Sequence, residues 1–408
     1  MDILRFSRPF QLAEGSPIRE LFPYLSQPGL ISFAGGYPSP ALFDLEGLQE
    51  ASQRAASHRA VFQYSSTEGV PALREQLAAL SATRGITIDA DNLLVTTGSQ
   101  QAFDLLTRVL LEPGDTVLVE APTYPATLQT LRLAGANVIP VPTDAHGIDT
   151  EQLAQWLATH GETRCPRLLY TVPTYSNPGG TLLSAPRRRQ LVSLARQHGF
   201  LVVEDDPYGD LNFTGVVHET LYALGLRAFG PEANPVLYLS SLSKTVAPAL
   251  RVGWLIAPGG ILRRCAIAKQ TADLCSSSLT QHLALEYLRL GRYTGSVERM
   301  TQAYRERADR LGQELTRQLG ATLDFVVPSG GMFLWGTLRS SSGMDALFQA
   351  AVAEGVLYVP GKAFYLPGPS ATALRLSFAS TPPEDIPEGV SRLARALAAP
   401  GVVEPTAD

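Results

Sequence analysis

Short apolar runs alternate with helical stretches between about residues 90 and 260, and this alternation constrains the fold more than any other feature. The runs are Asn92–Thr97, Thr116–Glu120, Asn137–Val141, Arg167–Val172, Phe200–Glu204, Val236–Ser240 and Gly253–Ala257. Near-continuous apolar strands separated by helices are typical of a mostly parallel sheet covered on both faces. The sequence therefore predicts an α/β fold whose functional residues lie just beyond the carboxyl ends of the strands.

A helical, arginine-rich segment follows residue 261, and short strands return after it. These strands are expected over Asp324–Pro328, Met332–Thr337, Val356–Pro360 and Ala373–Phe378. The change of pattern predicts a smaller α+β domain, and 408 residues suit one large and one small domain. We expect an amino-terminal arm over residues 1–40, a large domain over 41–295 and a small domain over 296–408.

Composition excludes several classes of protein. A chain with 45% hydrophobic and 17% charged residues is not disordered, and a net charge of −5 argues against nucleic acid as a partner. No apolar run reaches the roughly 18 residues of a membrane span, and the amino terminus lacks a signal-peptide pattern, so we expect a cytoplasmic protein. The histidines stand singly and the three cysteines form no C-x-x-C pair, so no metal site is expected.

Lysine is rare in this chain, which makes the position of Lys244 informative. The only lysines are Lys244, Lys269 and Lys362, although lysine and arginine together number 33. Lys244 follows an apolar strand in a turn rich in serine and threonine. An arginine cannot act there as an amine nucleophile, whereas a lysine can lose its proton and form an imine. We therefore expect Lys244 to react covalently, and Lys269 and Lys362 to be solvated.

The other strand ends are ambiguous when each is taken alone. Gly98-Ser99-Gln100 begins a helix and suits either a phosphate site or an ordinary helix cap. Asp205 and Asp206 suit an acidic pair, a metal site or a solvated turn. Ser241 to Lys244 matches the S-x-x-K motif of serine β-lactamases, but K-T-G is absent and the motif order is inverted, so a hydrolase is not expected.

Taken together, the strand ends suit one cofactor. Pyridoxal phosphate needs a lysine for the imine, a carboxylate for its ring nitrogen, donors for its ring oxygen, a stacking wall and a phosphate cup. Lys244 and Asp205 meet the first two needs. Asn177 and Tyr208 can bind the ring oxygen, and Tyr124 can stack on the ring. The predicted phosphate cup consists of Ser99, Gln100, Ser241, Ser243 and Arg251.

Short segments from about residue 30 to residue 380 share a further pattern. They are Ser32–Pro38, Gln63–Ser65, Gly69–Arg74, Thr97–Gln101, Ser176–Gly180, Glu204–Tyr208, Ser241–Lys244, Arg251–Trp254 and Arg375–Phe378. Together they resemble the fold type I pyridoxal-phosphate aminotransferases of class I/II, and among these the aminoadipate, kynurenine and broad-specificity aromatic or branched-chain enzymes. The resemblance implies ping-pong transfer of an amino group from an L-amino acid to 2-oxoglutarate.

The resemblance also implies roles for individual residues. Members are usually homodimers with shared active sites, so Tyr64 is expected to reach the phosphate bound by the partner subunit. Arg375 is expected to hold the substrate α-carboxylate, Asn177 to help position both this carboxylate and the ring, and Gly36 to contribute to substrate binding. Asp205 is preferred to Asp206 as the partner of the ring nitrogen because it precedes the ring-oxygen tyrosine, Tyr208, by the three-residue step of the family.

The choice of substrate and of reaction stays open at this point. The segment Ser16-Pro17-Ile18-Arg19 resembles a helix that covers the site in aminoadipate-type enzymes, where Arg19 would meet an acidic side chain or lie on a solvated face. Tyr37 and Gly179-Gly180 depart from the family pattern and are expected to reshape the pocket.

Two further classes of protein share the cofactor residues. A β-lyase, a decarboxylase or a cyclopropane-forming synthase would carry the same set. A transcription regulator built on an aminotransferase-like domain needs a winged helix, for which about forty residues before the Gly-Gly-Tyr-Pro segment are too few.

Overall fold

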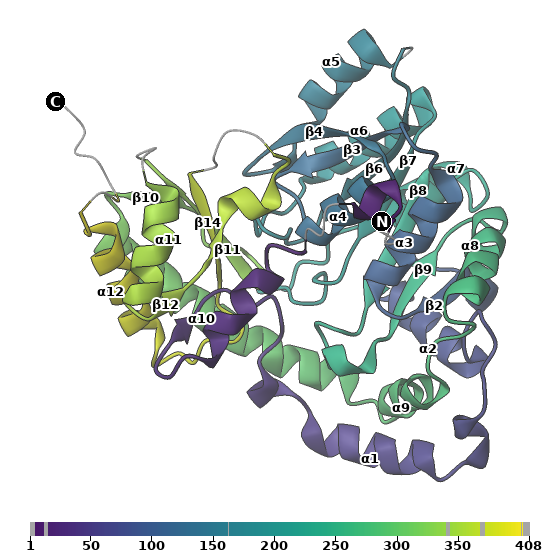
Figure 1. The fold of residues 1–408 in the computed structure, drawn as a ribbon. Coiled ribbons are helices and arrows are strands. Elements are labelled where there is room, and N and C mark those ends of the chain that lie inside the picture. The colour runs from purple at the N-terminus through teal and green to yellow at the C-terminus, as the bar shows by residue number, and fades with distance from the viewer. Residues whose placement is uncertain are drawn as a thin grey trace.

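An eight-stranded sheet and a four-stranded sheet organise the chain (Figure 1). The structure is a computed structural model that describes residues 5–11, 15–161, 163–339, 343–367, 372–400 and 402. No helix in these ranges is both long enough and apolar enough to cross a membrane.

The large sheet is mostly parallel, with strand order β2-β9-β8-β7-β6-β3-β4-β5. Its strands are β2 (Leu93–Thr96), β3 (Thr116–Ala121), β4 (Asn137–Asp144), β5 (Gly147–Ile148), β6 (Pro166–Thr171), β7 (Leu201–Asp205), β8 (Val236–Ser241) and β9 (Gly253–Ile256). Neighbours from β4 through β3, β6 and β7 to β8 pair in parallel, whereas β9 runs antiparallel to both β8 and β2, and β5 antiparallel to β4. The predicted α/β fold is confirmed.

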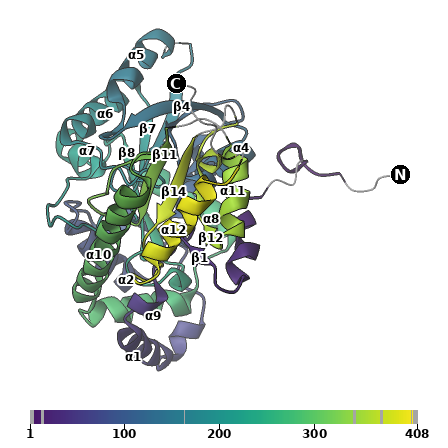
Figure 2. The same ribbon diagram turned by 90° about the vertical axis from the view of Figure 1, so that its left-hand side faces the viewer.

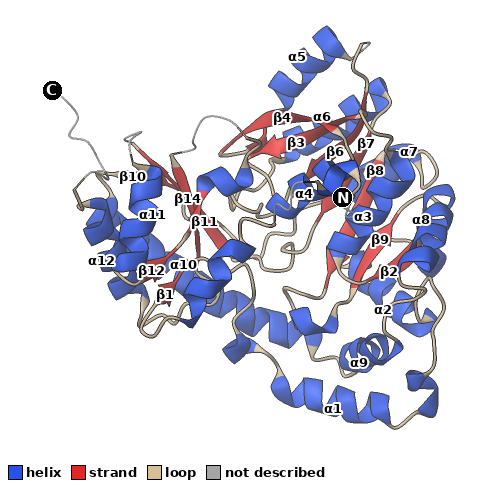
Figure 3. Ribbon diagram, in the orientation of Figure 1, coloured by secondary structure: helices blue, strands red, loops and turns tan. Residues whose placement is uncertain are grey.

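Helices cover both faces of this sheet, as Figure 3 shows. They are α2 (Pro71–Ala82), α3 (Ser99–Leu110), α4 (Pro125–Leu133), α5 (Thr150–His160), α6 (Ala185–His198), α7 (Leu221–Phe229), α8 (Gly259–Ala272) and α9 (Ser278–Arg289), whereas α1 (Leu45–Ala56) packs against α9. Alternate strand residues point to opposite faces. Leu168 accordingly packs in one core with α3, α4 and α8, and Leu169 in a second core with α2, α5, α6, α7 and α9.

The second sheet is antiparallel, with order β10-β11-β14-β13. It consists of β10 (Leu323–Phe325), β11 (Phe333–Leu338), β13 (Val359–Pro360) and β14 (Ala373–Ser377), with helices α10 (Tyr293–Leu319), α11 (Met344–Ala353) and α12 (Ile386–Leu397). Figure 2 shows α10, α11 and α12 packed beside these strands. We propose residue 296, near the start of the 27-residue α10, as the boundary between the two domains.

The amino-terminal segment pairs with the part of the chain that carries the second sheet. Strand β1 (Ile31–Ser32) pairs in parallel with β12 (Val356–Leu357). The single strand expected over Val356–Pro360 is therefore two short strands, because the chain pairs with β1 before Tyr358 and with β14 after it. The remaining elements are short 3-10 helices: η1 (Arg8–Phe10), η2 (Arg19–Ser26), η3 (Pro40–Leu42), η4 (Arg59–Phe62), η5 (Ala90–Asn92), η6 (Pro248–Leu250) and η7 (Gly361–Phe364).

A glycine allows the two layers to meet closely beside the ends of the large sheet. The backbone of residues 211–213 pairs with that of residues 329–331, through Phe213 N to Ser329 O (3.0 Å) and Gly331 N to Leu211 O (2.8 Å). A Cβ atom at Gly330 would overlap the ring of Tyr175 and lie 2.6 Å from Leu211 O. This junction has no room for a side chain at Gly330.

We expect Gly330→Ala to separate the two layers at this junction. Overpacking of this kind costs about 1–3 kcal/mol, so the thermal midpoint should fall by several degrees in differential scanning calorimetry. Gly259→Ala is the matched control, because a Cβ atom there meets no atom within 4 Å. Equal midpoints for the two variants would contradict the tight junction.

Candidate active site

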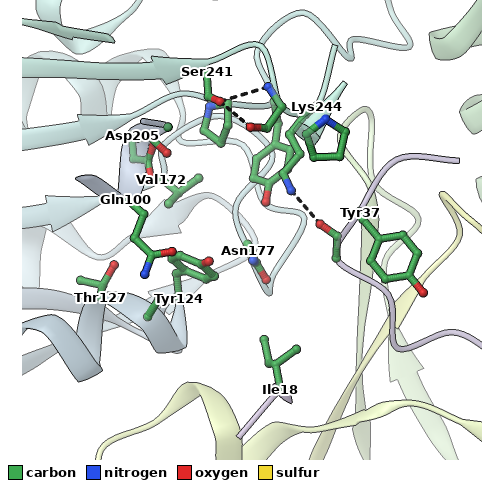
Figure 4. Close-up of a pocket in the computed structure, with 18 of the residues that line it drawn as sticks. Ile18, Tyr37, Gln100, Tyr124, Thr127, Val172, Asn177, Asp205, Ser241 and Lys244 are labelled. Carbon is green, nitrogen blue, oxygen red and sulfur yellow. Dashed lines mark hydrogen bonds between the residues drawn. The ribbon is translucent and has the colours of Figure 1, made fainter. Parts of the chain in front are cut away.

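One cavity collects almost all of the predicted site residues at the carboxyl edge of the large sheet (Figure 4). The residues that line it include Gly36, Ser99, Gln100, Tyr124, Asn177, Asp205, Tyr208, Ser241, Ser243, Lys244, Arg251 and Arg375. They come from the ends of several strands and from β14 of the second sheet. Tyr64 and Arg19 are the two predicted residues that do not line this cavity.

Lys244 projects into the cavity from the turn that follows β8. Its Nζ donates a hydrogen bond to the Gly36 carbonyl (2.7 Å). The turn is fixed by Ser241, whose Oγ accepts the Ser243 N–H (3.0 Å) and donates to Ser243 Oγ (2.8 Å). Burial, together with the charges of Arg375 and Arg251, lowers the pKa of Lys244 to about 8. A lysine with this pKa is partly uncharged near neutral pH, and the uncharged amine is the nucleophilic form.

Asp205 ends β7 with one carboxylate oxygen bonded and the other free. Tyr170 OH donates to Oδ2 (2.7 Å), while Oδ1 is buried without a hydrogen-bond partner among the described residues. Burial raises the pKa of Asp205 to about 6, although the Tyr170 hydrogen bond opposes that rise. A buried carboxylate with an unused acceptor suits the protonated ring nitrogen of pyridoxal phosphate, so the residues present fit this cofactor.

Asp206 points away from the cavity, since successive strand residues alternate in direction. Its Oδ2 accepts hydrogen bonds from Arg84, through Nη2 (3.0 Å) and Nε (3.3 Å), and from Tyr238 OH (3.1 Å). Of the two adjacent aspartates, only Asp205 lines the cavity. This placement supports Asp205 as the proposed partner of the ring nitrogen.

The predicted phosphate cup lies where β2 and β9 approach each other. Gly98 precedes α3 with φ 86°, and a Cβ atom there would lie 2.7 Å from Arg251 Nη2. A Cβ atom at Gly253 would lie 2.6 Å from the Gly98 carbonyl carbon. These close approaches bring the amino end of α3, with Ser99, next to the Arg251 guanidinium. A helix amino terminus beside an arginine suits a phosphate dianion.

Asn177 lies between the cofactor residues and Arg375. Its Oδ1 accepts a hydrogen bond from Arg375 Nη1 (2.8 Å), and it shares the cavity wall with Tyr208 and Tyr124. Burial raises the pKa of both tyrosines, which therefore stay neutral and can donate hydrogen bonds. The arrangement allows one amide to position both a ring oxygen and a carboxylate.

Arg375 is a fully buried cation on β14. Its Nη2 donates to Ala34 O (2.8 Å), its Nε has no partner among the described residues, and its guanidinium lies 4.2 Å from the Phe333 ring centre. Burial lowers its pKa to about 10, so it stays protonated near neutral pH. No carboxylate in the described part of the chain forms an ion pair with it, which leaves it available to a substrate carboxylate.

The cover of the cavity is apolar, a feature that the sequence interpretation missed. Ile18, Leu21, Phe22 and Leu25, from η2 and the residue before it, line the cavity, whereas Arg19 at the start of η2 is exposed. Their spacing of three and four residues is the apolar stripe of a helix, so the signal was present in the sequence.

Three further expectations can be compared with the structure. Tyr37 lines the cavity, but Gly179 and Gly180 do not. Gly180, with φ 63°, instead allows the chain to pass β11, because a Cβ atom there would lie 2.5 Å from Phe333 O. Lys362 is exposed beside Asp345 as expected, but the expectation of a solvated Lys269 is wrong: this side chain is fully buried.

Tyr170 was also missed, because its hydrogen bond to Asp205 joins two strands and leaves no local signal. The described residues include no group of three or more histidine, cysteine, aspartate or glutamate side chains placed to hold a metal ion.

The fold and the cavity together define an enzyme that uses pyridoxal phosphate, and comparison with known proteins identifies its family. Residues 34–393 match the family aminotransferase class I and II, and the chain belongs to that family. The predicted resemblance, the aminotransferase activity and the cofactor are thereby confirmed.

Individual relatives cover nearly the whole chain. It is 38% identical over 386 residues to the 2-aminoadipate transaminase of Thermus thermophilus, covering 94% of each protein. It is 35% identical over 388 residues to aromatic-amino-acid aminotransferase 1 of Thermococcus litoralis, covering 94% of this chain and 92% of that protein. The crystal structure of LysN, an α-aminoadipate aminotransferase from Thermus thermophilus, complexed with N-(5'-phosphopyridoxyl)-L-leucine, matches with a TM-score of 0.88 at 37% identity, over 96% of this chain and 97% of that one.

We expect Tyr170→Phe to move the acid limb of the pH profile of kcat/KM to higher pH. The variant loses a hydrogen bond to a carboxylate, worth about 1.5–3 kcal/mol, so the pKa of Asp205 should rise by about one to two units. Because the ionised carboxylate is the form that holds the ring nitrogen, activity should then fall off at a higher pH as the solution is acidified. Tyr222→Phe, at a buried tyrosine on α7, is the control. An unchanged acid limb in Tyr170→Phe would contradict this role.

Proposed function

We propose that this enzyme transfers the amino group of an L-amino acid with a large apolar or aromatic side chain to a 2-oxo acid, with 2-oxoglutarate as acceptor. The observation that carries the proposal is the apolar cover formed by Ile18, Leu21, Phe22 and Leu25 over a cavity that holds Arg375. A donor whose carboxylate binds Arg375 would place its side chain in an apolar surrounding, and burial of apolar surface favours binding by about 25 cal/mol per Å².

The proposed mechanism assigns each step to a side chain of this cavity. Bound pyridoxal phosphate supplies an electron sink for the substrate α-carbon. Arg375 binds the substrate carboxylate and Asn177 orients it. Lys244, whose pKa of about 8 leaves a neutral fraction near neutral pH, holds the cofactor and then moves the proton at the α-carbon. Asp205 keeps the ring nitrogen protonated, and Ser99 and Arg251 at the cup hold the phosphate.

The half-reaction tests the proposed donor class and separates transamination from lyase or decarboxylase chemistry. We expect L-phenylalanine or L-leucine, added without acceptor, to abolish the visible absorbance of the lysine-bound cofactor, and 2-oxoglutarate to restore it. Lys244→Ala should lack that starting absorbance. Faster conversion of L-2-aminoadipate than of both apolar donors would contradict the assigned donor class. Absorbance that persists while the amino acid is consumed would point to the lyase or decarboxylase alternatives, because these reactions return the cofactor to its lysine-bound form.

A second proposal concerns Arg19 at the rim. Arg19 is exposed and begins η2, directly after Ile18, which lines the cavity. We propose that Arg19 meets the side-chain carboxylate of an acidic substrate, namely 2-oxoglutarate or 2-aminoadipate. One cavity would then accept apolar donors against η2 and an acidic acceptor at its rim.

We expect Arg19→Gln to lower kcat/KM for 2-oxoglutarate by about tenfold, the scale of one hydrogen bond to a charged group. The kcat/KM for L-leucine should stay within about twofold, because leucine presents no second carboxylate. Arg264→Gln, at an exposed arginine of α8, is the matched control. Equal losses for both substrates would show that Arg19 supports the cover of the cavity and does not select the acceptor.

We also propose a homodimer in which Tyr64 contributes to the site of the partner subunit. Large apolar side chains are exposed on its own segment, in the loop after α8 and on α9: Phe62 (69%), Tyr64 (77%), Leu274 (49%) and Leu279 (41%). Exposed apolar surface is typical of interaction sites when it forms a patch. Ser65, the residue after Tyr64, contacts the loop after α8, because its side-chain Oγ donates a hydrogen bond to Ser276 O (3.4 Å).

A further inference from the structure

An ion pair between a buried lysine and a partly exposed aspartate lies behind the phosphate cup. Lys269 on α8 has no exposed side-chain surface, and its Nζ donates to Asp273 Oδ1 (2.8 Å), one helical turn further on. Removing an ammonium group from water is costly unless it is paired and hydrogen-bonded. Lys269, one of only three lysines in the sequence, therefore neither lines the cavity nor contacts solvent.

The Asp273 carboxylate also binds Gln101 on α3. Its Oδ2 accepts a hydrogen bond from Gln101 Nε2 (2.6 Å) and lies 3.5 Å from Thr97 Oγ1. The other end of the Gln101 amide, Oε1, accepts the Thr97 backbone N–H (2.7 Å). The amide is therefore held at both ends, and its orientation is set by the carboxylate that Lys269 holds.

The Thr97 peptide is the point at which these contacts reach the cup. Its N–H is bound by Gln101, and its carbonyl accepts from Arg251 Nη2 (2.9 Å). Thr97 directly precedes Gly98 and Ser99, the turn that aims the amino end of α3 into the cavity. A fixed Thr97 peptide therefore fixes both the direction of the helix terminus and the position of Arg251.

Asp273 also begins a loop that contacts the segment carrying Tyr64. Thr67 Oγ1 donates to Leu274 O (2.9 Å), and Ser276 Oγ lies 3.4 Å from Thr97 Oγ1. Leu274 adopts a positive φ of 64°, which a loop holds only when its surroundings determine it. The Asp273 carboxylate thus connects α8 with Gln101 and Thr97, and the loop that begins at Asp273 contacts the segment that carries Tyr64.

We propose that the Lys269–Asp273 ion pair is a positioning device for the phosphate of the cofactor, acting through Gln101 on the Thr97 peptide. Lys269 is a positioning residue and touches no reacting atom. The inference rests on the proposed function, because it requires that the phosphate binds at Ser99 and Arg251. It predicts an effect confined to the phosphate, since Lys244 and Asp205, which would hold the ring, form no hydrogen bond or ion pair with Asp273 in the described part of the chain.

The test compares the affinity of the cofactor-free enzyme for pyridoxal phosphate and for pyridoxal, which lacks the phosphate. Lys269→Met should weaken pyridoxal phosphate by at least about tenfold in equilibrium dialysis, and should leave pyridoxal within about twofold. Lys362→Met makes the same chemical change at an exposed lysine–carboxylate pair (2.5 Å) and should alter neither value.

A second variant decides the matter if Lys269→Met does not fold. Gln101→Met keeps the Lys269–Asp273 pair and removes only its link to Thr97, so it should show the same selective loss. Equal losses for both ligands, or no loss for either, would overturn the proposal and leave the ion pair a purely structural role. A wild-type enzyme that binds pyridoxal phosphate no better than pyridoxal would instead refute the cup itself, and with it the proposed function.

Discussion

The buried guanidinium of Arg375 is the contact on which the rest of the site depends. It lies on β14 of the second sheet, donates to Asn177 of the large domain and to Ala34 of the amino-terminal segment, and stacks on Phe333. Three parts of the chain that are distant in sequence therefore meet at one cation. Burying a charge without a counter-ion is unfavourable. A bound substrate carboxylate would supply the missing charge, so substrate binding would also affect the packing of these three parts of the chain.

The same reasoning extends to the cavity as a whole. Its lining contains the cations Lys244, Arg251 and Arg375 against one carboxylate, Asp205. Burial, with a further contribution from the charges of Arg375 and Arg251, lowers the pKa of Lys244 to about 8. An excess of positive charge attracts a phosphate dianion and a substrate carboxylate. The arginines that would bind the phosphate and the substrate carboxylate therefore also contribute to the lowered pKa of the Lys244 amine.

The sequence could predict that most of the strand-end residues line one cavity, because the carboxyl ends of parallel strands meet at one edge of the sheet and the residues that follow them are neighbours. It could not predict contacts that depend on how distant elements pack. Tyr170 reaches Asp205 from the neighbouring strand, and the split at Tyr358 depends on pairing with the amino-terminal segment. Lys269 was misjudged because a polar helix suggests solvent, although the scarcity of lysine was itself a clue.

The end of β7 shows how the strand geometry makes a chemically difficult sequence possible. Glu204, Asp205 and Asp206 are three consecutive acids, all buried. Strand alternation turns Glu204 and Asp206 to one face and Asp205 to the other. Glu204 accepts the N–H groups of the first two residues of α7 (2.9 and 2.8 Å), and Asp206 is paired with Arg84. Glu204 and Asp206 therefore both have hydrogen-bond partners on their own face of the sheet. On the opposite face, Asp205 Oδ1 has no partner among the described residues. The fold therefore pairs Glu204 and Asp206 and leaves Asp205 Oδ1 without a partner in the described part of the chain, so that this oxygen is available to a donor such as a protonated ring nitrogen.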